Sequence, residues 1–90
     1  MAYADIRIEA PEAFLAKTAS ADELYRIGLI YCEGMDVTVD LVQAHKWFNL
    51  AATRGHRDAK ILRQEMAEMM SQAEVLKAQK AAREWMKKAN

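Results

Sequence analysis

The sequence of 90 residues contains one cysteine, one proline and three glycines, and it has no excess of charge of either sign. With Cys32 as its only cysteine, the chain cannot form an internal disulfide, which favours a reducing compartment. Thirteen basic residues balance thirteen acidic ones, whereas a general DNA- or RNA-binding module normally carries a basic excess. No apolar run is long enough to cross a bilayer, and the first ten residues do not resemble a secretory signal. These absences favour a cytoplasmic protein that neither spans a membrane nor binds nucleic acid.

The residues that are abundant favour helices. Hydrophobic residues make up 52% of the chain and charged residues 29%, as in ordinary globular proteins. Alanine, leucine, methionine, glutamate, lysine and arginine, which are strong helix formers, dominate. A chain of this length forms one domain with a thin core. The sequence therefore predicts a single all-α domain over residues 1–90.

Capping signals divide this domain into helices. Ser20 and Ser71 are each followed three residues later by glutamate, the pattern of a capping box. Asp40 is placed to open a further helix, Gly55 to end it, and Pro11 to start a short one. The predicted helices span residues 11–17, 21–33, 40–54, 57–70 and 72–88. Because the connections are short, consecutive helices should pack as antiparallel neighbours.

The second half of the chain repeats the first. A shift of 38 positions places Ala44 on Ala82 and Trp47 on Trp85. A shift of 36 instead aligns Asp22 with Asp58 but loses the tryptophan match, so the register of the second unit stays open. Either shift predicts a helical hairpin that occurs twice, as in repeat proteins.

Large and small apolar residues stand close together in residues 43–59, "QAHKWFNLAATRGHRDA", most of which lie in the predicted helix 40–54. Adjacent helical residues point about 100° apart, so Trp47 and Phe48 cannot fill the same pocket. A helix in a stacked array has two buried sides, one against its hairpin partner and one against the next hairpin, and each ring can serve one of them. Alanines between them let the helices approach closely, and Gly28 indicates another close approach.

These positions together resemble the Sel-one-like repeat (SLR) family, a relative of the tetratricopeptide repeats. The family's unit reads approximately A-x-A-x-Y-x-L-G-x-x-Y-x-x-G, then G-V-x-x-D, then K-A-x-x-W-x-x-x-A-A-x-x-G-x-x-x-A. The match runs from Ala21 to about Ala59 and joins many positions at fixed spacing. The positions that we assign to the repeat are Ala21, Tyr25, Gly28, Tyr31, Gly34, Ala44, Trp47, Phe48, Ala51, Ala52, Gly55 and Ala59.

The resemblance implies a fold and a function. The fold is a right-handed α-solenoid of about two antiparallel hairpins, with a short N-terminal helix and a C-terminal capping helix. Residues 21–56 would form the first repeat, and residues 57–90 a degenerate second repeat with the cap. The resemblance further implies a bacterial-type repeat protein that binds other proteins through its concave surface. Cysteine-rich secreted relatives carry a disulfide in each repeat, and the single cysteine here departs from that branch.

By analogy with tetratricopeptide arrays, the exposed side of the first helix of each hairpin should contact the partner. The predicted partner-binding residues are Asp22, Arg26, Leu29, Cys32, Glu33, Lys60 and Arg63. For each of them an ordinary solvated surface is the alternative. His45 and His56 have no further ligands at metal-binding spacing, so neither a metal nor another cofactor is expected. We expect no enzyme, because no nucleophile stands beside a base and no glycine-rich phosphate loop occurs.

The sequence thus favours a non-catalytic adaptor that binds a protein or peptide partner. Two repeats are fewer than the three that repeat domains usually need, so a homodimer formed through exposed repeat edges is also possible. The alternative is a nucleic-acid-associated helical domain that uses the basic last helix, with Lys77, Lys80, Arg83, Lys87 and Lys88.

Overall fold

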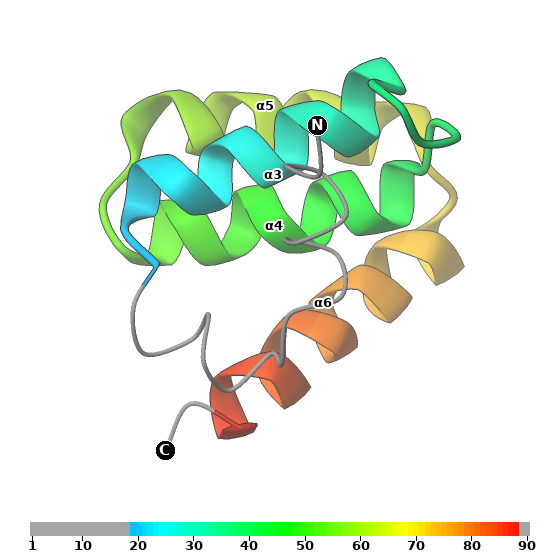
Figure 1. Cartoon of the computed structure of the whole chain (residues 1–90). Helices are drawn as coiled ribbons and strands as arrows, with labels where there is room; N and C mark the ends of the chain where they lie inside the picture. Colours follow the sequence, from blue (N-terminus) through cyan, green and yellow to red (C-terminus); the bar gives the residue numbers. More distant parts are fainter. Residues whose placement is uncertain (1–18, 89–90) are drawn as a thin grey trace.

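The computed structural model of the chain describes residues 19–88. Within this part of the chain it contains four helices and no strand (Figure 1). The helices are α3 (Ala21–Glu33), α4 (Leu41–Thr53), α5 (Arg57–Met69) and α6 (Gln72–Lys88). The prediction of an all-α fold is confirmed, and the four long predicted helices agree with these bounds to within one residue. The short helix predicted at residues 11–17 lies outside the described residues.

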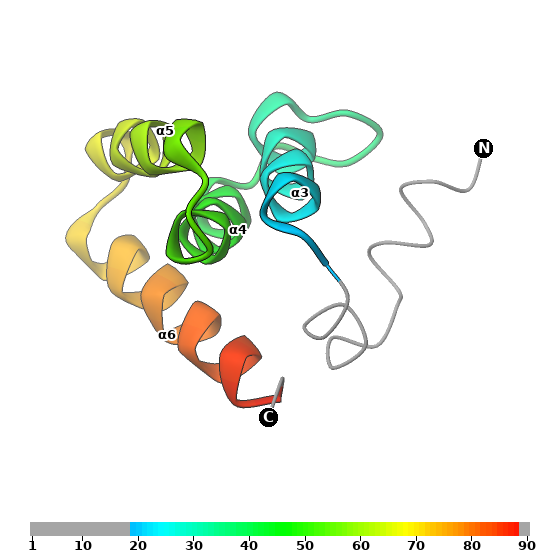
Figure 2. The same ribbon diagram turned by 90° about the vertical axis from the view of Figure 1, so that its left-hand side faces the viewer.

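Helices α3 and α4 form an antiparallel hairpin, whereas α5 and α6, although consecutive in the chain, both pack on α4 rather than on each other (Figures 1 and 2). Helix α4 is central, because α3, α5 and α6 all pack against it. Figures 1 and 2 both show α3 and α5 on one side of α4 and α6 on the other. The chain therefore has the architecture of a small helical solenoid, in which α5 and α6 both pack on the second helix of the first hairpin, α4.

Hydrogen bonds at the helix starts confirm the capping signals. Ser20 Oγ accepts from the backbone of Glu23 at 3.1 Å, and the Glu23 carboxylate accepts from the Ser20 amide at 2.8 Å. Ser71 and Glu74 form the same reciprocal pair at the start of α6. Asp40 caps α4 through its side chain. Each of these bonds satisfies an amide that the helix itself leaves unpaired.

Glycines with positive φ end the first two helices. Gly55 has φ 97°, and the amides of Gly55 and His56 donate to the carbonyls of Ala52 and Ala51. This paired arrangement is a Schellman motif, as expected for a glycine just past a helix end. Gly34 has φ 72° at the end of α3. Asp36, at φ 60°, also adopts the left-handed conformation, which aspartate tolerates better than most residues.

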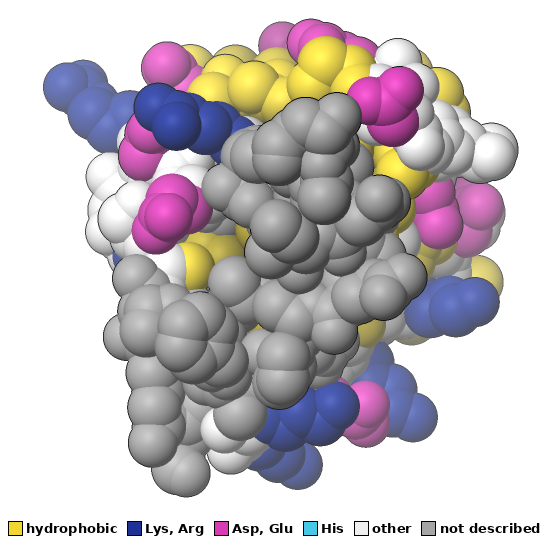
Figure 3. Space-filling model, in the orientation of Figure 1, with side chains coloured by type: hydrophobic (Ala, Val, Ile, Leu, Met, Phe, Trp, Pro, Cys, Tyr) yellow, Lys and Arg dark blue, Asp and Glu magenta, His cyan; other side chains and the backbone are white. Residues whose placement is uncertain are grey.

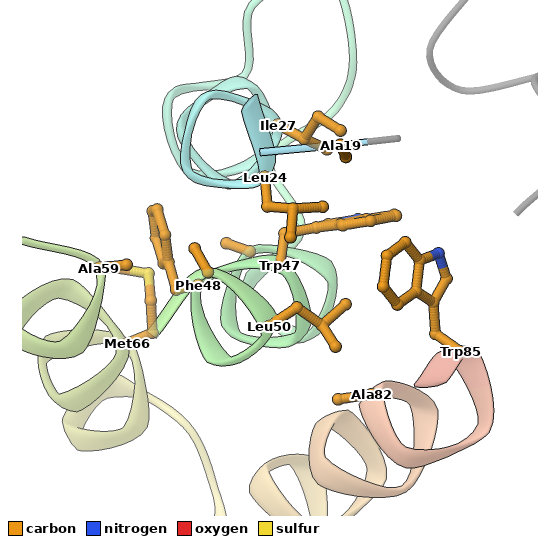
Figure 4. Close-up of a cluster of buried hydrophobic side chains, with 12 residues drawn as sticks. Ala19, Leu24, Ile27, Trp47, Phe48, Leu50, Ala59, Met66, Ala82 and Trp85 are labelled. Atoms are coloured by element: carbon orange, nitrogen blue, oxygen red, sulfur yellow. The ribbon is translucent and has the colours of Figure 1, made fainter. Parts of the chain in front are cut away.

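Trp47 and Phe48 face different neighbours, as predicted (Figure 4). Trp47 makes an edge-to-face contact with Trp85 of α6, with ring centroids 5.5 Å apart. Phe48 contacts Tyr25 of α3 at 5.7 Å and also lies toward Met66 of α5. The two rings thus point to different helices. Trp47 points to α6, and Phe48 lies between α3 and α5.

The spacing between α3 and α4 depends on Gly28. A Cβ atom at this position would lie 2.5 Å from a ring carbon of Phe48, closer than side chains in proteins approach one another. The predicted close approach is therefore confirmed, and its partner is an aromatic ring. Ala44 and Ala51, both with no exposed surface, form the small-residue seam beside this ring.

A histidine is buried on the α5 side of the central helix. His45 on α4 has only 2% of its surface exposed, and its Nδ1 has no hydrogen-bond partner among residues 19–88. Burial lowers the pKa of His45 below its usual value of 6.5, and the nearby positive charge of Arg63 lowers it further. In the folded protein this imidazole is therefore neutral at neutral pH.

The buried histidine makes folding stability sensitive to mild acid. Above the unfolded pKa of about 6.5 both states hold a neutral His45, so this residue adds no pH dependence there. As the pH falls from there towards the lower folded pKa, only the unfolded state takes up the proton. We expect the free energy of unfolding to fall by at most about 1.4 kcal/mol per pH unit in this window. Urea unfolding between about pH 7 and about pH 5 measures it, and His45→Leu should remove this component. An identical slope in His45→Leu would contradict the assignment.

Candidate protein-binding surface

The exposed side of α3 carries most of the residues predicted to bind a partner. Asp22, Arg26 and Glu33 are exposed, while Leu29 and Cys32 are half-buried. Asp22 and Arg26 lie one helical turn apart and form an ion pair of 2.7 Å. Because both side chains are more than half exposed, such a pair adds at most about 0.5 kcal/mol to the helix. The structure therefore leaves these charges accessible to another molecule.

An aromatic contact joins this surface to α5. The ring of His56 stacks on Tyr25, with centroids 4.1 Å apart and planes at 19°. Its Nδ1 accepts from the Ala59 amide at 3.1 Å and so caps α5. Its Nε2 lies 3.6 Å from the carboxylate of Asp22. His56 thus connects the start of α5 to the start of α3, a role that our reading of the sequence missed.

Half-buried apolar groups lie between the charged ones. Leu29, Cys32 and Tyr25 pack against the edge of the core and keep part of their surface exposed. Burial raises the pKa of the Cys32 thiol, and the carboxylates of Glu33 and Glu65 raise it further. A thiol in these surroundings stays protonated at neutral pH, so it behaves as an apolar contact rather than as a nucleophile.

Two acidic side chains of α5 raise the pKa values of residues on α3. Burial is the main cause that raises the pKa of Tyr25, and among nearby charges Asp58 of α5 has the largest effect. Glu65, also of α5, acts on Cys32 in the same way. With Asp22 and Glu33 on α3 and exposed Arg26 and Lys60 beside them, the surface formed by α3 and α5 carries charges of both signs.

The two basic residues predicted to bind a partner from α5 differ from each other in their surroundings. Arg63 donates to the side-chain oxygen of Asn49 on α4 at 2.7 Å and is half-buried. Lys60 is exposed. Arg63 stands four residues after Ala59 and three before Met66, both of which are buried, so it shares the side of α5 that faces α4. That spacing was the signal in the sequence for this orientation.

Helix α5 also exposes large apolar side chains. Ile61 is 58% exposed and Met69 is 61% exposed, whereas Met66 is buried at 3%. Figure 3 shows hydrophobic side chains along the upper edge of the molecule, flanked by acidic ones. In Figure 1 this edge is formed by α3 and α5. Apolar side chains that alternate with charges are suited to contacts with another protein.

Among residues 19–88, no three histidine, cysteine or carboxylate side chains gather where they could hold a metal ion. No helix in the described part of the chain is both long and apolar enough to cross a membrane. The two histidines have structural surroundings, His45 in the interior and His56 at the cap of α5.

Comparison with known families agrees with this architecture. No curated protein and no solved structure matches the chain significantly. The family model described as the Sel1 repeat matches residues 24–56 and residues 65–90, together more than half of the chain. Sel1 repeats are helical solenoid units that generally mediate protein–protein interaction and are typically non-catalytic. The chain, with α3, α5 and α6 packed around α4, belongs to the Sel1 repeat family.

Proposed function

We propose that this protein is a non-catalytic adaptor that binds a protein or peptide partner through the surface formed by α3 and α5. On α3 the contact would use Asp22, Arg26, Leu29, Cys32 and Glu33. On α5, Lys60 would contribute from the rim, while Arg63 would act mainly through its bond to Asn49. We propose the cytoplasm as its compartment, because a chain with one cysteine needs no oxidising environment.

One observation carries this proposal. Half-buried apolar side chains lie between exposed charges on two helices that share one side of α4, which is the composition of a protein-binding surface (Figure 2). Leu29 is the central example, because it packs against the core on one side and meets solvent on the other. Apolar contact would supply affinity at such a surface, and the flanking charges would select the partner.

The test is affinity capture from the native host with a charge-swapped variant. Arg26→Glu combined with Glu33→Arg reverses two exposed charges and keeps the net charge of zero. We expect a partner that the original protein captures to be lost or reduced at least about tenfold, because like charges would then face each other. The amount of each captured protein, measured by mass spectrometry, gives the result.

A matched control places the same kind of change elsewhere. Lys77→Glu combined with Glu84→Lys swaps two exposed charges on α6 and also keeps the net charge. This control should capture the partner as the original protein does. Equal capture by both variants would move the binding surface away from α3, and loss with the α6 variant alone would assign it to α6.

A further inference from the structure

The outer face of α6 is unpartnered within the described residues. The buried side of this helix consists of Ala78, Ala82 and Trp85, which face α4. The opposite side of the helix carries four exposed residues, spaced four, three and four positions apart: Leu76, Lys80, Arg83 and Lys87. We call these four residues the basic face of α6. Leu76, at 57% exposure, adds an apolar contact to three positive charges.

A second exposed surface has the opposite charge. Residues 33–40, here called the acidic loop, contain the exposed carboxylates of Glu33, Asp36 and Asp40. No lysine or arginine occurs between Arg26 and Lys46. The acidic loop also exposes large apolar side chains, since Met35 is 47% and Val39 is 52% exposed.

The acidic loop has a defined shape. The Met35 amide donates to the carbonyl of Ile30 at 3.0 Å, and the Asp40 amide donates to the carbonyl of Tyr31 at 3.1 Å. The side chain of Val39 lies so close to Gly34 that a Cβ atom there would be 2.9 Å from it. These contacts hold the backbone of the loop against the end of α3, so the loop presents its carboxylates from a defined position.

The two surfaces cannot meet within one molecule. Figures 1 and 2 both show the acidic loop beside the ends of α3 and α4, and α6 on the other side of α4. The basic face of α6 points away from α4, because its opposite side is the buried one. Figure 3 shows Lys and Arg side chains in the lower part, where α6 lies, and others at the upper left, while acidic side chains lie at the upper right and elsewhere along the upper half.

We propose that the basic face of α6 docks on the acidic loop of a second copy of this chain. Three cations would meet three carboxylates, and Leu76 would cover apolar surface of Met35 and Val39. The chain itself supplies both complementary surfaces, and its net charge of zero places no overall repulsion between copies. Because two different patches meet, the contact can join many copies head to tail. It can also form twice within a symmetric dimer, in which each copy's α6 docks on the other's acidic loop.

Salt dependence distinguishes this contact from an apolar one. Exposed charges interact over about 30 Å at about 0.01 M salt but over only about 3 Å at about 1 M. We therefore expect the average mass in sedimentation equilibrium to rise with protein concentration at low salt and to fall back to the monomer at high salt. A monomer mass at every concentration in low salt would overturn the proposal, and so would association that high salt leaves unchanged.

Charge-reversed variants test which surfaces meet. The helix variant carries Lys80→Glu and Arg83→Glu, and the loop variant carries Glu33→Lys, Asp36→Asn and Thr38→Lys. Asparagine at position 36 tolerates the left-handed backbone of Asp36. Each variant alone should associate at least about tenfold more weakly than the original chain, since its two surfaces then carry the same sign. A control with Arg57→Glu and Lys60→Glu, exposed on α5, makes the same change in net charge as the helix variant and should associate normally.

Mixing the two variants gives the decisive result. The acidic helix of one fits the basic loop of the other, and their unchanged surfaces fit in the same way, so the mixture should recover association. Circular dichroism of each variant confirms that it is folded before mixing. Failure of two folded variants to associate when mixed would overturn the proposal. Binding of an anionic polymer by the basic face of α6, with no self-association of the original chain, would assign that face to nucleic acid instead.

Discussion

Phe48→Ala is expected to lower the free energy of unfolding by about 3–5 kcal/mol, the usual range for removing a buried aromatic ring. Phe48 has no exposed surface and lies where α3, α4 and α5 meet (Figure 4). A domain of this size is stable by about 5–10 kcal/mol, so the variant should be close to unfolding at room temperature. Urea denaturation followed by circular dichroism measures the change.

Two further variants test the cause of this effect. Phe48→Leu keeps most of the apolar volume and should be less destabilising than Phe48→Ala. Gly28→Ala should lower the free energy of unfolding by about 1–3 kcal/mol, because its new methyl group overlaps the Phe48 ring. In a Phe48→Leu background that loss should shrink. A Gly28→Ala variant as stable as the original protein would contradict the close contact between α3 and Phe48.

Trp85→Ala is expected to destabilise the protein by about 3–5 kcal/mol and to detach α6 in particular. Trp85 is 1% exposed, contacts Trp47 edge to face, and lies 5.6 Å from the guanidinium of Arg54. Among the described helices α6 packs mainly on α4. Its amides should therefore exchange with solvent much faster in the variant, while α3 and α4 keep more of their protection. Hydrogen exchange with mass spectrometry measures both.

The matched variant for this position is Trp85→Phe. The indole nitrogen of Trp85 is buried and has no hydrogen-bond partner in the described part of the chain, so its removal takes away an unfavourable group. The phenyl ring still fills much of the space. We expect a loss of about 1 kcal/mol or less, well below that of the alanine variant. Equal losses in both variants would mean that packing of the ring does not hold α6.

Much of the fold could be predicted because its signals are local. Ser20 and Ser71 act through residues three positions away, and Gly55 ends α4 through its own backbone conformation. Such signals depend on few neighbours and can be read along the chain. The division of Trp47 and Phe48 could also be predicted, because adjacent helical residues must point in different directions.

Features that depend on how helices are placed against one another were predicted less well. The stacking of His56 on Tyr25 joins residues 31 positions apart, and nothing in either local sequence indicates it. Arg63 was assigned to a partner-binding surface by analogy, although its position between two buried residues directs it to Asn49. The partner-binding role of the exposed α3 residues stays a prediction, which the charge-swapped variant tests.

Trp47 and Phe48 point to different helices and hold α3, α5 and α6 on the central helix α4. A double-mutant cycle with Trp47→Leu and Trp85→Leu measures how strongly this packing joins α6 to α4, since the two rings contact each other. We expect the two losses of stability to be non-additive, with a coupling of about 0.5–1.5 kcal/mol, as for other aromatic pairs. Additive losses, with coupling below about 0.3 kcal/mol, would mean that the packing of α6 does not depend on this contact.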